Sequence, residues 1–421
     1  MKIDSVAHSN EASIGHAGLS LIGEMARISG LDHACLGITG MKQPQVSDPD
    51  ILRSLCGLIA QGKTDFDHIR EFAKDAFFQQ SLGIDRIASA ETLRQRFEYM
   101  SACSGFEERI QQCSAALGQK MGVKPEQTKI DDQPWVRLDL DVTVFDNSDT
   151  KKEGAGFTYD GRYGFAPIFA HLGGGWMVNA QLRPGSAHTF AAGTMDFIKQ
   201  SLDCTGQLID DPVLLVADSG FDSRELISLL ANRDNTGFII KHNLRKESKT
   251  QWLEDAKRHG RIVKRAADKV VYRGSLYRPV EGLEAPVRMV FEVTEIKSKD
   301  GQLLWAPEII VFSAWTSLEA AEEDVLKAYR QRGTSEQYHA EFKSELDIER
   351  LPSGKFGVNS AFLKMGMLVY NMFKVIGQDM VFAKALGLKK ATRRRMKTIM
   401  RSIIYMCGRI TRHARRFILQ L

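Results

Sequence analysis

The sequence predicts an α/β protein in which a helical domain comes first, a central domain built on a mixed sheet follows, and a basic helical region ends the chain. Three observations predict this class. Apolar residues recur at three- and four-residue spacing up to about residue 130. From Trp135 the pattern changes to alternation and to short unbroken apolar runs, which are typical of strands. After Thr316 the helical spacing returns and continues into a segment rich in arginine and lysine.

Composition indicates a globular protein with a large core. The chain has 421 residues, of which 43% are hydrophobic and 26% are charged, which is ordinary for soluble domains and suggests two or three of them. No apolar run is long enough for a transmembrane helix, and the first residues do not resemble a secretory signal. The six cysteines form no C-x-x-C pair, so neither a zinc site nor a disulfide scaffold is expected. We therefore expect a reduced, cytoplasmic protein.

The net charge of +5 is unevenly distributed. Segment 381–421 carries twelve Lys or Arg and no Asp or Glu, which leaves 45 basic and 52 acidic groups, a net charge of −7, in residues 1–380. A basic end on an acidic body suggests a polyanionic partner. A solvated helical surface explains the same charge, so charge alone does not decide between the two.

The N-terminal domain, residues 1–130, has helical spacing in three stretches: Ala17–Ile28, Asp50–Ala60 and Phe66–Phe77. Ser89 could cap a further helix that displays Arg94 and Arg96. A capped helix with arginines, coming after another helix, suits a DNA reader of the helix-turn-helix type. Helical pairs are also common in proteins that bind no DNA, so these two arginines are candidate DNA contacts only.

The central domain, residues 131–375, begins with strands. In Val136–Val142 apolar residues alternate with polar ones, so that Asp139 and Asp141 face the same side of one strand. Val213–Ala217 is an unbroken apolar run, typical of a strand buried on both faces, and Asp218 follows it directly. The other elements expected around these two strands are the strands Phe165–Ala170, Met177–Leu182 and Gly237–Lys241 and the helices Thr189–Leu202 and Ser223–Ala231.

Residues 242–317 are predicted to form an insertion of mostly antiparallel strands. Its strand candidates are Lys269–Tyr277, Arg288–Ile296 and Leu303–Thr316. A capping box of Thr316 with Glu319 then predicts the start of a long helical region, with a restart near Gly333 and a helix over Ala361–Ile376. This order of elements is that of a ribonuclease-H-like fold with a late insertion, although other α/β folds could share it.

Asp141 and Asp218 occupy positions suited to a metal site. One lies on the polar face of a strand, and the other lies just past a buried strand, where α/β sheets place their ligands. Magnesium prefers carboxylate and water oxygens, and two ions about 3.5–4 Å apart can drive phosphoryl transfer. An isolated aspartate at a strand end is more often a turn or cap residue, so these positions need further support.

That support comes from Tyr329, Arg332, Glu336 and Lys343, which follow one another at spacings of three, four and seven residues. On a continuous helix they would lie within about 60° of arc. A carboxylate flanked by Arg, Lys and a phenol suits a site that holds metal and phosphate together. A charged solvent-facing surface with coincident spacing is the competing interpretation.

These four residues resemble the Y-R-E-K signature of DDE transposases of bacterial insertion sequences. Leu138–Thr143 resembles the first-aspartate motif of these enzymes, and Ala217–Phe221 resembles the second. Three further stretches are similar to insertion-sequence family 1380 in particular: Tyr159–Pro167, Leu182–Gly185 and Ser89–Phe97. The resemblance covers roughly residues 15–375.

The resemblance implies roles for the motif residues. Asp141, Asp218 and Glu336 would bind two Mg²⁺ or Mn²⁺ ions, with Asp141 preferred to Asp139 by the D-x-T pattern. The other residues of the signature would contact phosphates near the scissile bond. The partners would be double-stranded DNA, at the element ends and the target, and a second copy of the chain on paired ends.

Other candidates rest on position alone. In some relatives a tryptophan of the insertion stabilises a flipped base, which makes Trp305 and Trp315 candidates, although a core tryptophan is the commoner case. Four residues, Lys241, His242, Arg245 and Lys246, follow a strand end and could line the DNA path, although a solvated loop explains them equally well. His339 lies near the helical face of Glu336 and could touch DNA.

The sequence therefore predicts a transposase that binds terminal inverted repeats, cuts a strand to leave a 3′-hydroxyl, and transfers that strand. Two alternatives remain open. One is a ribonuclease-H-like nuclease that cuts but never joins. The other is a DNA-binding protein derived from a transposase that has lost catalysis, against which the presence of all three acids argues.

Overall fold

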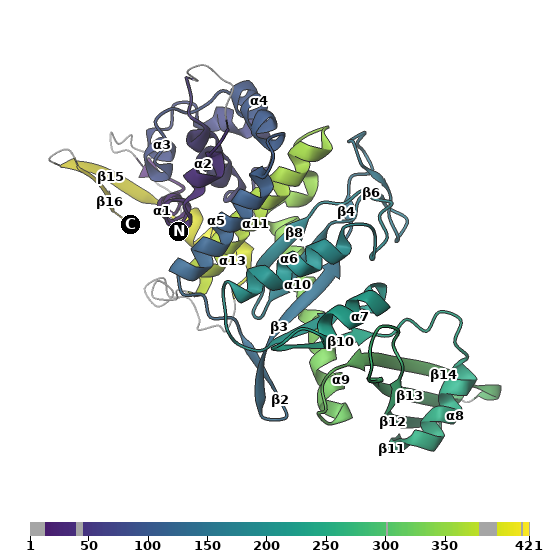
Figure 1. Ribbon diagram of the computed structural model, residues 1–421. Helices are drawn as coiled ribbons and strands as arrows, with labels where there is room; N and C mark the ends of the chain where they lie inside the picture. Colours follow the sequence, from purple (N-terminus) through teal and green to yellow (C-terminus); the bar gives the residue numbers. More distant parts are fainter. Residues whose placement is uncertain (1–12, 39–44, 300–301, 379–393, 414–415, 421) are drawn as a thin grey trace, which may run out of the picture. The chain divides into compact units, whose positions relative to one another are not determined.

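The computed structural model describes residues 13–38, 45–299, 302–378, 394–413 and 416–420 (Figure 1). The chain forms two compact units. Unit 1 contains residues 1–123, 145–153 and 340–421, and unit 2 contains residues 124–144 and 154–339. Both units are discontinuous in sequence, whereas the domains predicted above are continuous segments.

Unit 1 is mainly helical, as its hydrophobic spacing predicts. Its N-terminal helices are α1 (Leu19–Ser29), α2 (Asp48–Ile59), α3 (Ala76–Leu82), α4 (Ala90–Ser101) and α5 (Phe106–Lys120). Capping residues fix where several of them begin. The Ser47 side chain accepts a hydrogen bond from Asp50 N, and the Ser89 side chain accepts one from Thr92 N, so that each satisfies a free N–H of the first turn.

The core of unit 1 is completed by α11 (Phe356–Gln378), which comes from the far end of the chain. Residues 358–376 of this helix are buried. The Phe362 ring packs edge-on against Phe66 and Phe97. Asn371 donates a hydrogen bond of 2.8 Å to Ser114 Oγ. A helix buried on all sides needs partners all round, and within this unit α11 has them in the N-terminal helices.

Two expectations for unit 1 are wrong. The stretch predicted as one helix over Phe66–Phe77 is a 3₁₀ segment (Phe66–Phe72) followed by α3, because Asp75 caps a new helix there with bonds to two backbone N–H groups. The C-terminal end is not helical throughout. After α13 (Met396–Ile399) and a π-turn come two strands, β15 (Gly408–His413) and β16 (Arg416–Gln420), and β15 pairs with both β16 and β1 (Ser13–Ile14).

Unit 2 is built on one large mixed sheet with the strand order β11-β12-β13-β14-β10-β9-β3-β7-β8. Its central strands are β3 (Gln133–Val142), β9 (Val213–Ala217) and β10 (Thr236–Lys241), of which β9 is parallel to both neighbours. The strand β2 (Gln127–Ile130) pairs with β3, and β7 (Ile168–Leu172) and β8 (Trp176–Gln181) complete that edge. The helices α6 (Thr194–Gly206) and α7 (Arg224–Ala231) connect the strands, as the sequence predicts.

The predicted β-rich insertion extends this sheet rather than forming a separate one. Its strands are β11 (Gly260–Arg265), β12 (Lys269–Arg278), β13 (Val287–Lys299) and β14 (Gln302–Thr316), all antiparallel to their neighbours, and β14 pairs with β10. The segment also contains a helix, α8 (Lys249–His259), that the sequence reading missed. Only its Trp252, Leu253 and Ala256 are buried, so its apolar stripe is narrow.

A helical segment crosses from the sheet toward the end of unit 2. It consists of α9 (Glu322–Arg330), a 3₁₀ turn (Gln331–Thr334) and α10 (Ser335–Ala340). Val325 and Leu326 of α9 pack on Val216, Ile239 and Ala314 of the sheet. The helix begins after Ala321, so the predicted capping box at Thr316 is wrong. Thr316 Oγ1 instead accepts a hydrogen bond from Leu318 N in the turn after β14. The predicted restart near Gly333 is confirmed.

The glycine turn between β7 and β8 positions α10. Gly175 has a φ of +91°, and a Cβ there would lie 2.6 Å from the ring of Tyr338. Only a glycine permits both this left-handed backbone and so close an approach. The Tyr338 ring therefore rests directly on the turn, which holds α10 against the β7–β8 end of the sheet.

Candidate active site

The register of two parallel strands brings Asp141 and Asp218 together. Asp139 of β3 lies opposite Val216 of β9. Continuing both strands by two residues places Asp141 beside Asp218, on the same edge of the sheet. The sequence places Asp141 and Asp218 at separate strands. The parallel pairing of these strands brings the two carboxylates together.

Arg332 joins the two carboxylates. Its Nη2 donates to Asp141 Oδ1 at 2.7 Å and lies 3.5 Å from Asp218 Oδ2. The same nitrogen is 3.3 Å from the carbonyl oxygen of Leu140. Burial lowers the pKa of this guanidinium, but the two carboxylates outweigh that effect and raise it. Arg332 is therefore a fixed positive charge between two negative ones.

The pKa values of the two aspartates are shifted in opposite directions. Burial raises the pKa of Asp141, but hydrogen bonding by His339 and the charge of Arg332 outweigh it, so the net shift is downward. His339 Nε2 lies 3.3 Å from Asp141 Oδ2. For Asp218, burial prevails over the charge of Arg332, and the pKa is raised. Asp218 Oδ1 accepts a hydrogen bond of 2.8 Å from Gly220 N, as the cap of a 3₁₀ turn over Ser219–Phe221.

Asp139, the alternative to Asp141, is engaged elsewhere. It is buried, and Arg137 Nη2 donates to its Oδ2 at 2.6 Å. Arg137 also reaches Gln331 Oε1 at 3.3 Å, in the 3₁₀ turn. Burial raises the pKa of Asp139, and Arg137 acts against that rise. The buried pair ties β3 to the helical segment that carries Arg332.

Of the remaining signature residues, Tyr329 lies within electrostatic reach of Arg332, Asp218 and Asp141. Tyr329 packs against Phe312 with ring centroids 5.0 Å apart, and burial raises the pKa of its phenol to about 12. Glu336 is exposed on α10. Lys343 belongs to unit 1, where its Nζ lies 2.8 Å from Glu349 Oε1. The change from α-helix to 3₁₀ turn and back, followed by a π-turn over Glu341–Glu345, breaks the single helical face that the spacing suggested.

The donor atoms at this site fit a divalent cation in part. Asp141 and Asp218 offer hard carboxylate oxygens that converge on one positively charged nitrogen, and this is the ligand type that Mg²⁺ prefers. Among the residues that the structure describes, no three His, Cys, Asp or Glu side chains gather closely enough to hold a metal ion. Glu336 is therefore not assembled with the two aspartates.

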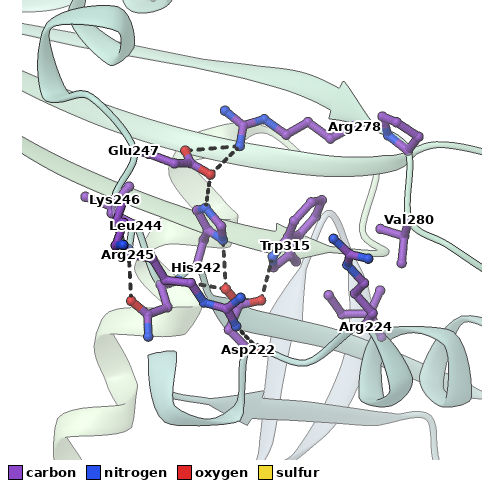
Figure 2. A pocket seen from close by; sticks show the side chains of 13 residues that line it. Asp222, Arg224, His242, Leu244, Arg245, Lys246, Glu247, Arg278, Val280 and Trp315 are labelled. Atoms are coloured by element: carbon purple, nitrogen blue, oxygen red, sulfur yellow. Dashed lines mark hydrogen bonds and ion pairs between the residues drawn. The ribbon is translucent and has the colours of Figure 1, made fainter.

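A second polar cluster is formed by residues that follow β9 and β10, together with Arg278 of β12 and Trp315 of β14 (Figure 2). His242 Nδ1 lies 2.8 Å from Asp222 Oδ2, and its Nε2 lies 3.0 Å from Glu247 Oε1. Trp315 Nε1 donates to Asp222 Oδ1 at 2.9 Å. Arg278 Nη1 approaches Glu247 at 3.1 Å. These groups line a cavity of about 550 Å³.

The histidine of this cluster is held between two acids. Burial lowers the pKa of His242, but Asp222 and Glu247 outweigh it and raise that pKa, while the pKa of Asp222 is lowered. The sequence reading named His242 only as part of a possible DNA path and missed Asp222 and Glu247. A usable signal existed, since Asp222 and His242 follow adjacent parallel strands at the edge where Asp218 lies.

The structure describes only one of the two tryptophans proposed to stack on a flipped base, Trp305 and Trp315, with its side chain. Trp315 is buried, with its N–H bonded to Asp222, so it is not free to stack on a base in this structure. The side chain of Trp305 lies outside the described residues, although the backbone there belongs to β14. Trp315 is thus a core residue that ties the last insertion strand to the loop after β9.

Four other candidate DNA contacts differ in how far they are buried and in what they contact. Arg96 is buried and pairs with Asp48, so this guanidinium joins α4 to α2 inside unit 1. Arg94 is exposed and pairs with Glu91 on its own helix. Lys241 lies over the Phe312 ring at 6.0 Å. Arg245 is exposed, with a φ of +48°, and its Nη2 is 3.3 Å from the carbonyl oxygen of Asp222.

The basic C-terminal stretch is described only in part. Lys384, Lys389, Lys390 and Arg393 lie outside the described residues. Arg395 pairs with Glu345 at 2.5 Å. Within the described ranges, no helix is both long enough and apolar enough to cross a membrane.

The model of the family "Transposase DDE domain group 1" matches residues 7–421. A cryo-EM structure of a piggyBac transposase synaptic complex with hairpin DNA is similar at a TM-score of 0.44 and 13% sequence identity, over 94% of this chain and 82% of that one. No curated protein matches the chain.

Proposed function

The chain belongs to the transposase DDE domain group 1 family, and on this basis we propose that it is the transposase of a bacterial insertion sequence, which binds terminal inverted repeats and then cuts and transfers DNA strands. The observation that carries the proposal is the convergence of Asp141 and Asp218 on Arg332 at the ends of adjacent parallel strands. Family membership alone does not say which residues act, and this cluster supplies two acids and a fixed cation at one place.

The proposed ligands are Asp141 and Asp218, with Glu336 as the third. Divalent ions held there would activate the attacking hydroxyl and stabilise the leaving oxygen of a phosphodiester. Glu336 is exposed and stands apart from the aspartates, so its carboxylate has to approach them when ions and DNA are bound. Metal and DNA would thus complete the site together.

Arg332 has a second role in this proposal. A guanidinium that spans two carboxylates keeps both of them oriented. The same guanidinium would also bind two oxygens of a phosphate in a bidentate manner. Tyr329 and Lys343 are proposed as further phosphate contacts. His339 would hold Asp141 in place through its 3.3 Å contact.

The chemistry needs no covalent intermediate with the protein. Water attacks the phosphorus and the 3′-oxygen leaves as a hydroxyl. That hydroxyl then attacks a second phosphodiester, in the other strand or in target DNA, so that each bond broken is matched by one formed. Because two DNA ends must be joined, we propose that a homodimer assembles on paired ends.

The experiment uses the purified full chain and duplex DNA that carries the sequences flanking its gene. Cleavage is measured with Mg²⁺, with Mn²⁺ and with chelator, for the unaltered chain and for Asp218→Asn and Glu336→Gln. Matched controls are Asp203→Asn and Glu323→Gln, which alter exposed acids elsewhere in the same unit.

We expect metal-dependent cutting at the repeat ends, lost by at least about 100-fold in both site variants while DNA binding persists. Cutting without joining would favour the nuclease, and binding without cutting by the unaltered chain would favour the inactive DNA-binding protein. Cutting that survives both site variants would remove these residues from the mechanism.

A further inference from the structure

A short hairpin beside the candidate active site exposes two aromatic rings. It consists of β5 (Gly156–Phe157) and β6 (Tyr163–Phe165), which pair as Gly156 with Gly164 and Phe157 with Tyr163. Phe157 is 73% exposed and Tyr159 is 70% exposed. No other large hydrophobic side chain in the described part of the chain is as exposed as these two. Large apolar groups gathered on a surface usually mark a binding site.

The tip of the hairpin is held in one conformation by contacts within the turn. Thr158 N donates to the Arg162 carbonyl oxygen at 2.8 Å, and Thr158 Oγ1 is 2.7 Å from Asp160 Oδ1. Gly161 provides the left-handed residue of the turn, with a φ of +85°. Arg162 and Asp160 form an ion pair across it. Because the tip is already ordered, little conformational entropy is lost when a ligand binds there.

The base of the hairpin is equally fixed. Gly185 packs so closely that a Cβ there would lie 2.3 Å from the carbonyl oxygens of both Gly156 and Gly164. The buried side chain of Arg183 donates to the Ala166 carbonyl oxygen at 2.9 Å and to that of Thr189 at 2.9 Å. These contacts give a physical role to the Tyr159–Pro167 and Leu182–Gly185 motifs, which the metal site leaves unexplained.

The hairpin projects from the strand end that carries Asp141. Its second strand leads within three residues into β7, where Ile168 lies opposite Val142 and Phe169 lies opposite Asp141. Pro167 accepts a hydrogen bond from Thr143 N at 3.2 Å. Partial burial raises the pKa of Tyr159, and the charges of Asp141, Asp160 and Asp218 add to the rise. The phenol therefore lies within electrostatic reach of both active-site aspartates.

Charge indicates which part of a DNA molecule such a tip would meet. The Asp160–Arg162 pair leaves the tip without net charge, so it is poorly suited to hold a phosphate. The exposed faces of Phe157 and Tyr159 suit a flat, apolar partner, and a nucleobase has such a face. A base inside a duplex offers no free face, so the partner must be a base that has left its stack.

We infer that the β5–β6 hairpin is a wedge, in which Phe157 and Tyr159 stack on an unpaired nucleobase of the DNA next to the scissile bond. The inference rests on the proposed function, which places DNA at Asp141 and Asp218. In this inference, the wedge opens the base pair next to the cut. The carboxylates and Arg332 do not perform that step.

The experiment combines a binding readout with a cutting readout. Duplexes that carry the sequences flanking the gene are made with 2-aminopurine on either side of the cut, fully paired or with one mismatch at the adjacent pair. The chain is unaltered, or carries Phe157→Ala with Tyr159→Ala, Tyr159→Leu or Tyr159→Phe. Tyr277→Ala is the matched control, since Tyr277 is 54% exposed and belongs to β12.

In chelator, the unaltered chain should change the 2-aminopurine fluorescence on binding, and the double variant should not. With Mg²⁺, the double variant should cut the paired duplex about 5- to 100-fold more slowly, the range expected for lost base stacking. The mismatch should restore its rate to within about threefold. Tyr159→Phe should retain the activity, Tyr159→Leu should lose it, and the control should be unaffected.

Several results would overturn the wedge. One is an equal fluorescence change in the unaltered chain and the double variant. Another is a loss of cutting that the mismatch does not repair, which would indicate a structural role. A third is a change of oligomeric state without DNA in the double variant, which would make the rings an interface with a second copy. If the unaltered chain cuts neither duplex, the proposed function fails, while the fluorescence comparison still decides on the wedge.

Discussion

At the scale of single residues, the candidate site depends on how one guanidinium is shared. Asp141 has three groups that favour its ionised form, namely Arg332, His339 and Val142 N, and its pKa is lowered. Asp218 receives one backbone N–H and a more distant contact with the same guanidinium, and its pKa is raised. Two identical side chains on neighbouring strands thus have opposite shifts because their surroundings differ.

Replacing Arg332 with Lys tests this sharing. A lysine keeps the charge but has a single ammonium in place of the planar fork, so it cannot bridge two carboxylates or hold a phosphate in the same way. We expect Arg332→Lys to slow metal-dependent cleavage by at least about tenfold, with DNA affinity little changed. Arg330→Lys, two residues earlier in an exposed pair with Glu292, is the control. Equal rates for both variants would show that the bridge has no catalytic role.

His242 should make stability depend on pH. Its pKa is raised in the folded chain, so its contribution is complete below its unfolded value of about 6.5 and is lost as pH rises through the folded value. Asp222 has a lowered pKa, so its contribution is complete above its unfolded value of about 3.9 and is lost as pH falls through the folded value. The cluster should therefore stabilise most between about pH 4 and 6.5.

The measurement is the unfolding midpoint of the unaltered chain and of His242→Gln at several pH values. The difference between them should be largest near pH 6 and should shrink as pH rises toward 9. Glu247 faces the imidazole as well, and Arg278 donates a hydrogen bond to Glu247, so Arg278→Gln should shift the whole curve without removing its pH dependence. A difference that grows with pH would contradict the assignment of charge to His242.

At the scale of elements, the turn between β7 and β8 is a point where one methyl group matters. Gly175 and Gly193 both have a left-handed backbone, with φ of +91° and +86°. A Cβ at Gly175 would meet the Tyr338 ring at 2.6 Å, whereas a Cβ at Gly193 would have no neighbour within 4 Å. Alanine at Gly193 would therefore test backbone strain alone, whereas alanine at Gly175 would add steric overlap with the Tyr338 ring.

We expect Gly193→Ala to cost about 1 kcal/mol, the usual effect of a side chain at positive φ. Gly175→Ala should cost about 2–4 kcal/mol, because the Tyr338 ring must move as well. Urea unfolding monitored by tryptophan fluorescence gives both numbers. Similar losses in the two variants would mean that the ring yields easily and that α10 is not fixed by this turn.

Some helices and strands could be predicted from the sequence, and others could not. Val213–Ala217 was expected as a buried strand and is β9 with those bounds, because a short unbroken apolar run has few alternatives. The strands expected at Phe165–Ala170 and Met177–Leu182 are found, with shifted bounds, as β7 and β8. The helix α8 was missed, since its few buried residues stand in a highly polar run. Strands β15 and β16 were missed because their basic residues hide the alternation.

Local patterns cannot supply what depends on pairing between distant segments. Nothing in the insertion sequence shows that β14 pairs with β10 and continues the central sheet. The parallel register that places Asp141 beside Asp218 is equally non-local. The predicted common face of Tyr329, Arg332 and Glu336 assumed one continuous helix, and the 3₁₀ turn at Gln331–Thr334 interrupts it. Arg96 is buried with Asp48, a contact between helices that no spacing rule reveals.

At the scale of the whole molecule, charge and connectivity are the features that matter. The basic segment 381–421 stands on an otherwise acidic chain. If it binds DNA phosphates, each lost contact should lower the slope of log affinity against log salt by about 0.9. We expect Lys384→Gln with Lys389→Gln and Lys390→Gln to reduce that slope by up to about three.

The salt dependence is measured by fluorescence anisotropy with duplex DNA. Replacing the same three lysines with arginine keeps the charge and should leave the slope unchanged. The single-turnover cleavage rate at saturating protein should be the same for all three chains, because these residues lie far in sequence from the acids. An unchanged slope in the glutamine variant would move the phosphate contacts elsewhere.

The late position of α11 in the chain bears on how the protein is made. On the ribosome, helices α1 to α5 emerge more than two hundred residues before the helix that fills their core. A nascent or prematurely terminated chain would carry an unfilled apolar groove, and chaperones and proteases act on such surfaces. A fragment ending at Gln337 should accordingly be digested rapidly by a protease that spares the full chain, and its survival as a folded unit would show that the early helices can close without their partner. If they cannot, a cell that makes incomplete copies would accumulate no stable fragment able to compete with the complete protein for the ends of the element.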